Sequence, residues 1–312
     1  MDRAPTFGLP FFYRVVLPGA VVTAFLSPLV FRLIDAIPRI APYEGQVLLS
    51  LAVGLGFLLS ILSDFIYESY EGRWWPSRLA RWRTKQWQDH VSALLTKAQD
   101  QKDPAFAERW SELRQFPVAT GDDGIVRPTA TAPTKMGNVL ASYEQYPQLR
   151  YGMESVFYWE RLWLAIDKDV RHEIDSSWAP TDALLYASAG LFGASAVYLV
   201  VALVSLSFAL VGPTYLDMPT LASELGAVVL GLALSGLLYS WSIPGHVANG
   251  EAFKSVFDLY RSRLAPMRTA TAEERWSWET TFEMLQYPDY CDGSDNTSAQ
   301  SVSSEPTDTE TE

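Results

Sequence analysis

Four long stretches of the chain contain no charged residue. They comprise 17 residues from Val15 to Phe31, 19 from Gly45 to Ser63, 31 from Ala183 to Pro213 and 21 from Leu225 to Gly245. A helix needs about 20 mostly apolar residues to cross the hydrocarbon core of a bilayer. The pattern predicts four transmembrane helices. The first gains length from a snorkelling Arg32, and the third must tilt or extend out of the bilayer.

Two other interpretations of these stretches are weaker. Buried helices in the core of a large soluble protein would still show a polar stripe. A signal peptide at residues 15–37 would have a shorter apolar run and a small-residue cleavage site after it. We therefore expect an all-α membrane protein, with a helical cytosolic domain between membrane helices two and three and a helical C-terminal segment.

Lysine and arginine concentrate before the first stretch and after the second and fourth. These residues are Arg3, Arg14, Arg73, Arg78, Arg81, Arg83, Lys85, Lys254, Arg261, Arg263 and Arg268. The connection between the third and fourth stretches, residues 214–224, contains none. Short cytoplasmic flanks carry the excess of positive charge in membrane proteins. The distribution predicts a multi-pass protein of the cell membrane with both termini and residues 66–182 in the cytoplasm.

The polar segments divide the chain into five parts. We expect an N-terminal segment with two membrane helices at 1–67, a cytosolic helical domain at 68–182, two membrane helices at 183–245, cytosolic C-terminal helices at 246–290 and an acidic tail at 291–312. From Asp292 to Glu312 there are six acids, no base and almost no apolar residue. That composition predicts a disordered tail.

The segment after the second membrane helix combines tryptophan with basic residues. Trp74, Trp75, Trp82 and Trp87 lie among five arginines and lysines. Both residue types favour the headgroup layer of the inner leaflet, so the segment is typical of a helix lying on the membrane surface. Burial of this helix within the cytosolic domain is the alternative.

Helix start and stop signals subdivide the other polar segments. We expect a helix at 104–116 with Asp103 as N-cap, a helix at 135–145 that Thr134 caps and Pro147 ends, and a helix at 151–165. Residues 117–135 are predicted to form a loop with one tight hairpin. After the fourth membrane helix, we expect an amphipathic helix at 247–264. A capping box of Thr271 and Glu274 begins the last helix.

Small residues spaced four apart occur in three of the membrane stretches. The pairs are Gly56 with Ser60, Ala189 with Gly193, Gly190 with Ala194, and Gly231 with Ser235. Such pairs allow helix backbones to approach closely in lipid. They favour packing within one bundle, and a pore or an oligomer seam is the alternative.

Composition and motifs argue against several classes of function. A net charge of −12 disfavours nucleic-acid binding. The single cysteine, Cys291, excludes an internal disulfide, and the three histidines are far apart in the sequence. Walker, G-x-S-x-G and H-E-x-x-H motifs are absent. The sequence therefore predicts no catalytic, cofactor or metal site and favours a protein without enzymatic activity.

Three acids form the sharpest candidate interaction site. Asp64, Glu68 and Glu71 fall on one face of the helix that ends the second membrane stretch. Anionic lipid and the helix dipole both disfavour acids in that position, so they require cations. Arg73 and Arg78 offer local pairing. The alternative is docking of an arginine from the cytosolic helices, for which the candidates are Arg150, Arg161 and Arg261.

Two further stretches carry a resemblance. The first contains Met136-Gly137-Asn138, Arg150-Tyr151-Gly152 and Trp159-Glu160-Arg161-Leu162, and the second is Phe257-Asp258-Leu259-Tyr260-Arg261. Together they resemble a set of uncharacterised prokaryotic four-helix membrane proteins. There, Leu-Gly-Asn, Arg-Tyr-Gly and Trp-Pro-Arg-Leu segments precede two membrane helices and a Phe-Asp-Leu-Tyr-Arg helix follows them. Met136 replaces the usual Leu and Glu160 the usual Pro. The resemblance implies a shared architecture and no particular activity.

Within the second half of this region, Glu154 and Arg161 fall on one helix face, and Asp258 lies in the last motif. A salt-bridge or packing role is the commoner use of such residues, and an active site is the alternative.

Three functions remain open from the sequence. The leading hypothesis is a membrane-anchored interaction or signalling protein that binds a cytosolic protein partner. The alternatives are a channel formed as a homo-oligomer and a membrane enzyme acting on lipid at the inner leaflet. In each case the lipid bilayer is a partner and nucleic acid is not.

Overall fold

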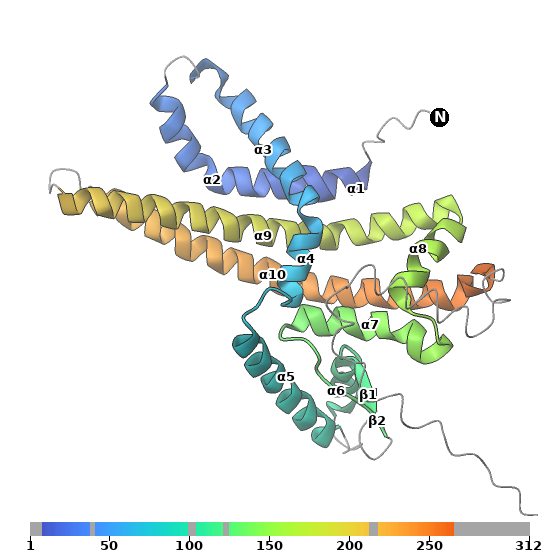
Figure 1. Cartoon of the computed structure of the whole chain (residues 1–312). Coiled ribbons are helices and arrows are strands. Elements are labelled where there is room, and N and C mark those ends of the chain that lie inside the picture. Colours follow the sequence, from blue (N-terminus) through green and yellow to red (C-terminus); the bar gives the residue numbers. More distant parts are fainter. Residues whose placement is uncertain (1–7, 38–40, 99–103, 121–124, 212–217, 265–312) are drawn as a thin grey trace, which may run out of the picture.

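Four helices of the chain are long and apolar enough to cross a membrane, as predicted (Figure 1). The computed structural model describes residues 8–37, 41–98, 104–120, 125–211 and 218–264. The first of the four helices consists of α1, a π-helical turn and α2, and the other three are α3, α9 and α10. Their bounds are Leu9–Phe11, Phe12–Val16, Leu17–Asp35, Glu44–Ile61, Lys168–Val211 and Met218–Tyr260.

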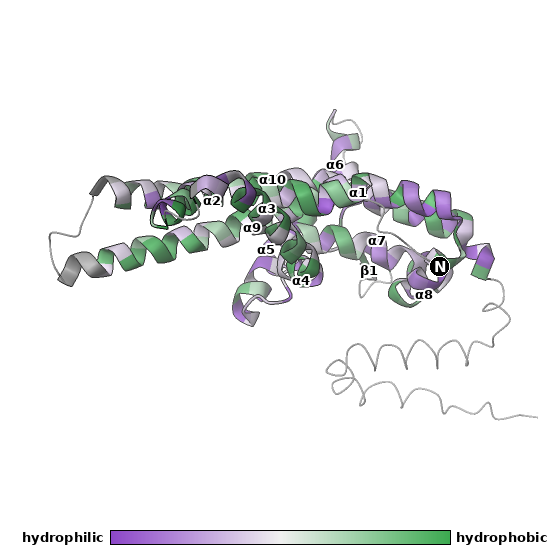
Figure 2. Cartoon of the chain, turned by 90° about the horizontal axis from the view of Figure 1, so that it is seen from above, coloured by the Kyte–Doolittle hydropathy of each residue, from purple (hydrophilic) through white to green (hydrophobic). Residues whose placement is uncertain are grey.

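The helices α9 and α10 form a long antiparallel hairpin through the centre of the molecule (Figure 1). Each is longer than its predicted membrane stretch. α9 begins at Lys168, well before Ala183, and α10 continues to Tyr260 and a short 3-10 turn, Arg261–Leu264 (η4). Hydrophobic residues dominate the half near the hairpin turn, and hydrophilic residues gather toward the other end (Figure 2).

One sequence prediction changes here. The amphipathic helix expected at 247–264 is the C-terminal part of α10, because Pro244 lies within the helix without ending it. The predicted final helix at Thr271 and the acidic tail lie outside the described residues.

Close backbone contact joins the four long helices. A side chain at Gly56 of α3 would overlap the backbone carbonyl of Val15, and one at Gly231 of α10 would overlap Ser195 of α9. Gly190 of α9 faces Val22 of α2 in the same way. These predicted small residues therefore serve packing within one chain.

The polypeptide between α3 and α9 forms a helical insert, which we define as residues 63–167. Its elements are α4 (Ser63–Glu71), α5 (Ser77–Lys97), α6 (Phe106–Leu113), β1 (Val118–Thr120), β2 (Val126–Pro128), α7 (Lys135–Tyr151) and α8 (Ser155–Ala165). The strands pair antiparallel, with Val118 opposite Pro128, which agrees with the predicted hairpin. In Figure 1 the insert from α5 to α7 lies on the α10 side of the hairpin, opposite α2 and α3.

The start of α7 was predicted correctly and its end was not. The Thr134 hydroxyl accepts a hydrogen bond of 3.0 Å from the Gly137 amide, as an N-cap should. Pro147 does not end the helix, which continues to Tyr151 and stops at Gly152 in the left-handed conformation (φ +64°). Pro147 is fully buried, and its packing offsets the hydrogen bond that proline removes. Asp103, the expected cap of α6, lies outside the described residues.

Three apolar clusters hold the insert to the long hairpin and to itself. The first joins α8 to the insert-side ends of α9 and α10 around the fully buried Phe257. The second joins α4 and α7 to the middle of the hairpin around Met136 and Leu185. The third lies inside the insert, where Val91 of α5 packs against Leu113. The insert therefore packs against the long hairpin along a broad surface.

The tryptophan-rich helix α5 combines features of both predicted environments. Trp87 packs toward Phe116 in the third cluster, while Leu79 and Trp82 on the same helix are exposed. One face is thus buried in the insert and another remains open. That the open face rests on the inner leaflet stays a prediction.

Candidate functional site

A network of charged and phenolic side chains lies where the first helix, α4 and α9 meet. Arg14 donates from Nε to Asp182 Oδ2 over 2.6 Å and from Nη1 to Asp175 Oδ1 over 2.5 Å. The Tyr67 hydroxyl donates to the other oxygen of Asp182 over 2.6 Å. We call these four residues the boundary cluster. They link three helices at the insert-side end of the membrane bundle.

Local helix geometry positions each member of the boundary cluster. Asp175 and Asp182 are seven residues apart and therefore share one face of α9. Arg14 lies in the π-helical turn Phe12–Val16. Such single-turn interruptions of an α-helix are frequent at functional sites. Tyr67 reaches the cluster from α4, the continuation of α3 beyond a turn at Leu62.

Burial makes the boundary cluster dependent on its hydrogen bonds. The Asp182 side chain is 11% exposed and that of Arg14 is 26% exposed. A buried carboxylate without a partner is strongly destabilising, so each donor to Asp182 matters. Burial raises the pKa of the Tyr67 phenol well above its usual value, and the negative charge of Asp182 raises it further. Tyr67 therefore remains a donor at every physiological pH.

A buried histidine completes the surroundings of Tyr67. The His246 ring of α10 meets the Tyr67 ring edge-on, with centroids 5.7 Å apart. His246 is 2% exposed, and its Nε2 has no hydrogen-bond partner in the described structure. The fourth long helix thus also contacts the cluster, through an aromatic contact.

Beside the boundary cluster, a second polar network crosses from α4 to the hairpin. Ser188 and Ser235 each donate to the other's backbone carbonyl over 2.8 Å. The Tyr70 hydroxyl lies 2.7 Å from Ser188 Oγ, and the Tyr70 ring stacks on Tyr239 with centroids 5.1 Å apart. Reciprocal bonds of this kind satisfy polar groups within an apolar bundle and fix the register of α9 against α10.

An ion pair also closes the far end of the bundle. Arg32 near the end of α2 donates from Nη1 to Glu224 Oε1 of α10 over 3.0 Å. The Glu224 side chain is 2% exposed, and Ser205 of α9 lies 3.4 Å from its second oxygen. The first helix therefore carries one paired arginine near each end.

The insert is joined to α4 by a tight backbone junction, which we define as Glu71, Gly72, Pro133, Thr134 and Gly137. Gly72 ends α4 with a φ of +91°, and a side chain there would overlap Pro133. The Thr134 hydroxyl donates to the Glu71 carbonyl over 3.1 Å. A side chain at Gly137 would press against that same carbonyl. The start of α7 is thus seated directly on the end of α4.

Asn138 of the quoted motif supports this junction from behind. It is fully buried, and its Oδ1 accepts from the amides of Thr131 and Ala132 at 2.9 and 3.1 Å. Its Nδ2 donates to the carbonyls of Ala132 and Thr134 at 2.9 and 2.7 Å. Every hydrogen-bonding position of this amide is therefore used to shape the loop before α7.

The three acids predicted as a docking site use local partners instead. Glu71 accepts from Arg73 Nε over 2.6 Å, and Glu68 lies 3.8 Å from Arg73 and accepts from the Trp74 indole over 3.1 Å. Asp64 accepts from Ser63 Oγ at 3.3 Å. These contacts match the local alternative.

The arginines proposed to dock there are engaged elsewhere or exposed. Arg161 donates to the Phe157 carbonyl over 2.5 Å and lies over the Phe157 ring. Arg261 donates to the Asp258 carbonyl and lies over the Tyr151 ring. Arg150 is exposed on α7. The structure forms no ion pair between these arginines and the three acids, all of which it describes.

The two remaining candidates have structural roles. Glu154 caps α8 by accepting from the amides of Val156 and Phe157 at 3.0 and 2.5 Å. Asp258 accepts from the hydroxyls of Tyr146, at 2.8 Å, and of Tyr151, and so ties α10 to α7. Neither arrangement pairs Glu154 with Arg161.

Sequence reasoning missed the ion pairs that Arg14 and Arg32 of the first helix form. Arg14 and Asp182 had both been placed at one end of the bundle by the predicted threading, and Arg32 and Glu224 at the other. Opposite charges at the same end of neighbouring helices were therefore the available signal. Each of these residues flanks an uncharged stretch, where a single charge is ordinary.

No family model, curated protein or solved structure matches the chain. The resemblance to prokaryotic four-helix membrane proteins therefore stays a prediction. Within the described residues, no group of three or more histidine, cysteine, aspartate or glutamate side chains could hold a metal ion. The boundary cluster is suited to holding helices together in one arrangement.

Proposed function

We propose that the protein is a membrane-anchored interaction or signalling protein, in which the insert and the end of α10 bind a protein partner in the cytoplasm. The observation that supports this best is the continuity of α9 and α10. Each helix runs without a break from the apolar bundle into the cluster around Phe257. A movement of either helix in the membrane therefore displaces the packed surface at its other end.

The boundary cluster and the junction strengthen this mechanical link. Arg14 fastens the first helix to α9 at the point where α9 leaves the apolar bundle. Glu71 and Thr134 fasten α4 to α7. All four long helices thus reach the insert through packed contacts, which can carry energetic coupling between two sites.

The proposed partner surface lies at the end of the molecule away from the bundle. Leu164 of α8 and Leu259 of α10 are 76% and 71% exposed. Exposed leucines beside a packed helical core are typical of interaction surfaces when they gather. Arg261 and Arg263 lie close by in η4 and add polar contacts at the edge.

In-cell photocrosslinking tests the proposal. A photoreactive phenylalanine analogue replaces Leu164 or Leu259 in the full chain, and the matched control replaces Val229, which is 69% exposed on the apolar part of α10. We expect a protein adduct of one defined mass at Leu164 or Leu259 and none at Val229. Absence of a protein adduct at both leucines, or the same adduct at all three positions, would contradict the proposal.

A further inference from the structure

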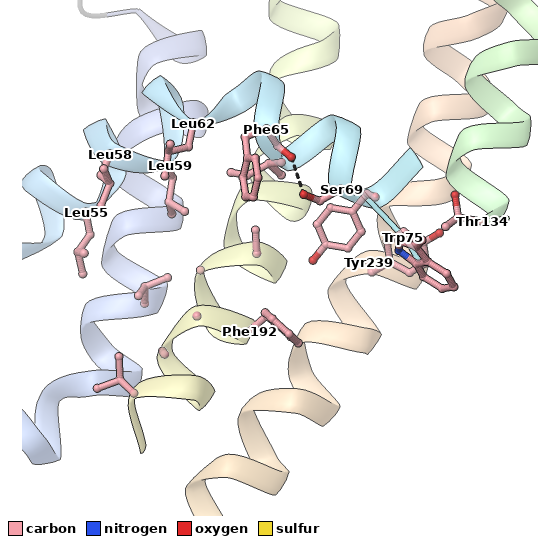
Figure 3. A pocket seen from close by; sticks show the side chains of 18 of the residues that line it. Leu55, Leu58, Leu59, Leu62, Phe65, Ser69, Trp75, Thr134, Phe192 and Tyr239 are labelled. Carbon is pink, nitrogen blue, oxygen red and sulfur yellow. Dashed lines mark hydrogen bonds between the residues drawn. The ribbon is translucent and has the colours of Figure 1, made fainter. Parts of the chain in front are cut away.

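A deep groove runs along the outside of the bundle from the middle of α2 and α3 to the junction. Its volume is about 960 Å³. Figure 3 shows the leucines of α3 at one end, Phe192 of α9 below the middle, and Trp75, Thr134 and Tyr239 together at the other end. The groove therefore begins among membrane-spanning helices and ends at the insert.

The bundle end of the groove is lined by hydrocarbon. Leu26, Leu55, Leu58, Phe192 and Val197 form its walls. At Gly193, an added side chain would meet no atom within 4 Å, so the glycine leaves the floor open. A long apolar channel of this kind matches an acyl chain, which offers only apolar surface.

The insert end of the groove has the opposite character. Arg83 of α5 and Lys135 at the start of α7 both line it and are both half-buried. Arg83 donates to Gln86 over 2.7 Å and lies 6.0 Å from the centre of the Trp87 ring, and among the described residues neither Arg83 nor Lys135 forms an ion pair with a carboxylate. By contrast, Arg14, Arg32 and Arg73 are all paired with carboxylates.

Two tryptophans frame this cationic end. Trp75 and Trp87 both line the groove beside Arg83. Tryptophan favours the headgroup level of a bilayer, and basic side chains favour anionic lipid. The groove therefore has apolar walls at one end and aromatic and cationic side chains together at the other, as a phospholipid has an acyl chain at one end and a charged headgroup at the other.

We propose that this groove binds one anionic phospholipid of the bilayer. An acyl chain lies between α3 and α9, and the phosphate lies between Arg83 and Lys135. The volume is at the upper end of the roughly 300–1,000 Å³ usual for small-molecule sites, which suits one lipid. The proposal goes beyond the protein's proposed function, since it depends on the groove and not on a protein partner.

Native mass spectrometry of the full chain in mild detergent tests the headgroup. The probes are phosphatidylglycerol and phosphatidylcholine with identical acyl chains. We expect one phosphatidylglycerol per chain to be retained in preference to phosphatidylcholine. Replacing both cations, R83Q with K135Q, should reduce its retention about tenfold or more, from the loss of two basic contacts at the membrane surface. The matched control is R81Q with K85Q, which removes the same charge from exposed positions of α5 outside the groove.

A second pair of variants tests the chain. G193L fills the floor of the groove, and its control, G236L, places the same side chain at an exposed position of α10 where an added side chain also meets no atom. G193L should lose phosphatidylglycerol and G236L should retain it. Three results would overturn the proposal. They are equal retention of both lipids by the wild type, unchanged retention of phosphatidylglycerol in R83Q with K135Q, and a lipid-free dimer that G193L dissociates. The last result would assign the groove to a second copy of the chain.

Discussion

Arg14 and Asp182 are 168 positions apart in the chain and are joined by a hydrogen bond of 2.6 Å. Their contact fixes the first membrane helix against α9 where α9 passes from the apolar bundle toward the insert. Because Tyr67 donates to the same carboxylate, one aspartate holds three helices together.

The Arg14–Asp182 pair should contribute measurably to stability. We expect R14Q and D182N each to lower the free energy of unfolding by about 2–3 kcal/mol, between the values for exposed and buried pairs. The double variant should lose clearly less than the sum, because the second change removes a charge that is already unpaired. Thermal unfolding of the wild type, the two single variants and the double variant in detergent measures this double-mutant cycle.

The matched control for this cycle is the exposed pair of Arg263 and Asp167, whose atoms lie 2.8 Å apart. R263Q should lower the free energy of unfolding much less than R14Q, because solvent screens an exposed pair. Additive losses in the Arg14–Asp182 cycle, or equal losses in R14Q and R263Q, would show that the boundary cluster is an ordinary surface contact.

Two glycines in the left-handed conformation allow the cost of backbone strain to be distinguished from the cost of a steric overlap. Gly72 and Gly152 end α4 and α7 with φ values of +91° and +64°. An added side chain at Gly152 meets no atom, whereas one at Gly72 overlaps Pro133. Both G72A and G152A should lower the free energy of unfolding by roughly 1–2 kcal/mol through backbone strain. G72A should destabilise further and loosen the junction.

Limited proteolysis and melting temperature of the two alanine variants measure this difference. The expected order of stability is wild type, then G152A, then G72A, with new cleavage before Thr134 in G72A alone. The reverse order would mean that the seating of α7 on α4 does not hold the insert in place.

Glu144 should make stability depend on pH near neutrality. Burial, together with the nearby charge of Glu71, raises the pKa of the Glu144 carboxyl from 4.5 to about 7. The folded protein therefore binds a proton that the unfolded chain has released. Stability from this group is fully present below about pH 4.5 and is lost as the pH rises through about 7.

The variant E144Q keeps the shape of the side chain and removes the titration. At pH 8 it should be more stable than the wild type by on the order of 1–3 kcal/mol, with little difference at pH 5. Melting curves at pH 5, 6.5 and 8 test this expectation. If the stability of the wild type relative to E144Q rises with pH, the pH dependence is opposite to the expected one and the prediction is wrong.

The predicted threading places α5 and the α2–α3 connection on opposite sides of the membrane. In a C291S background, a cysteine at the exposed Arg81 should react with a membrane-impermeant thiol reagent only after cells are opened. A cysteine at the exposed Glu44 should react in intact cells. Labelling of R81C in intact cells would reverse the orientation.

The four long helices were predictable because an uncharged stretch of about 20 residues has few other stable uses. The cap at Thr134 was also predictable, since its effect is local. The end of α7 was not predictable from Pro147, because tertiary burial keeps α7 helical through a residue that ends helices in isolation.

The boundary cluster could not be predicted from local pattern. Arg14 and Asp182 lie in different helices, and each appears in sequence as an ordinary flanking charge. Their contact depends on the crossing of the first helix and α9. Glu68 and Glu71 pair with their sequence neighbour Arg73, which is the local alternative, and in the described part of the chain Arg150, Arg161 and Arg261 form no ion pair with them.

In the proposed function, the bundle and the insert respond together through the boundary cluster and the unbroken helices. Amide hydrogen exchange of the full chain in nanodiscs measures this coupling most directly. The variants to compare are R14Q and R32Q, the latter at the far end of the first helix. R14Q should accelerate amide exchange in α7 and at residues 250–260 of α10, as well as around Asp182. R32Q should leave those regions unchanged. Exchange in R14Q that changes only around Asp182, with α7 and residues 250–260 as in the wild type, would contradict the coupling.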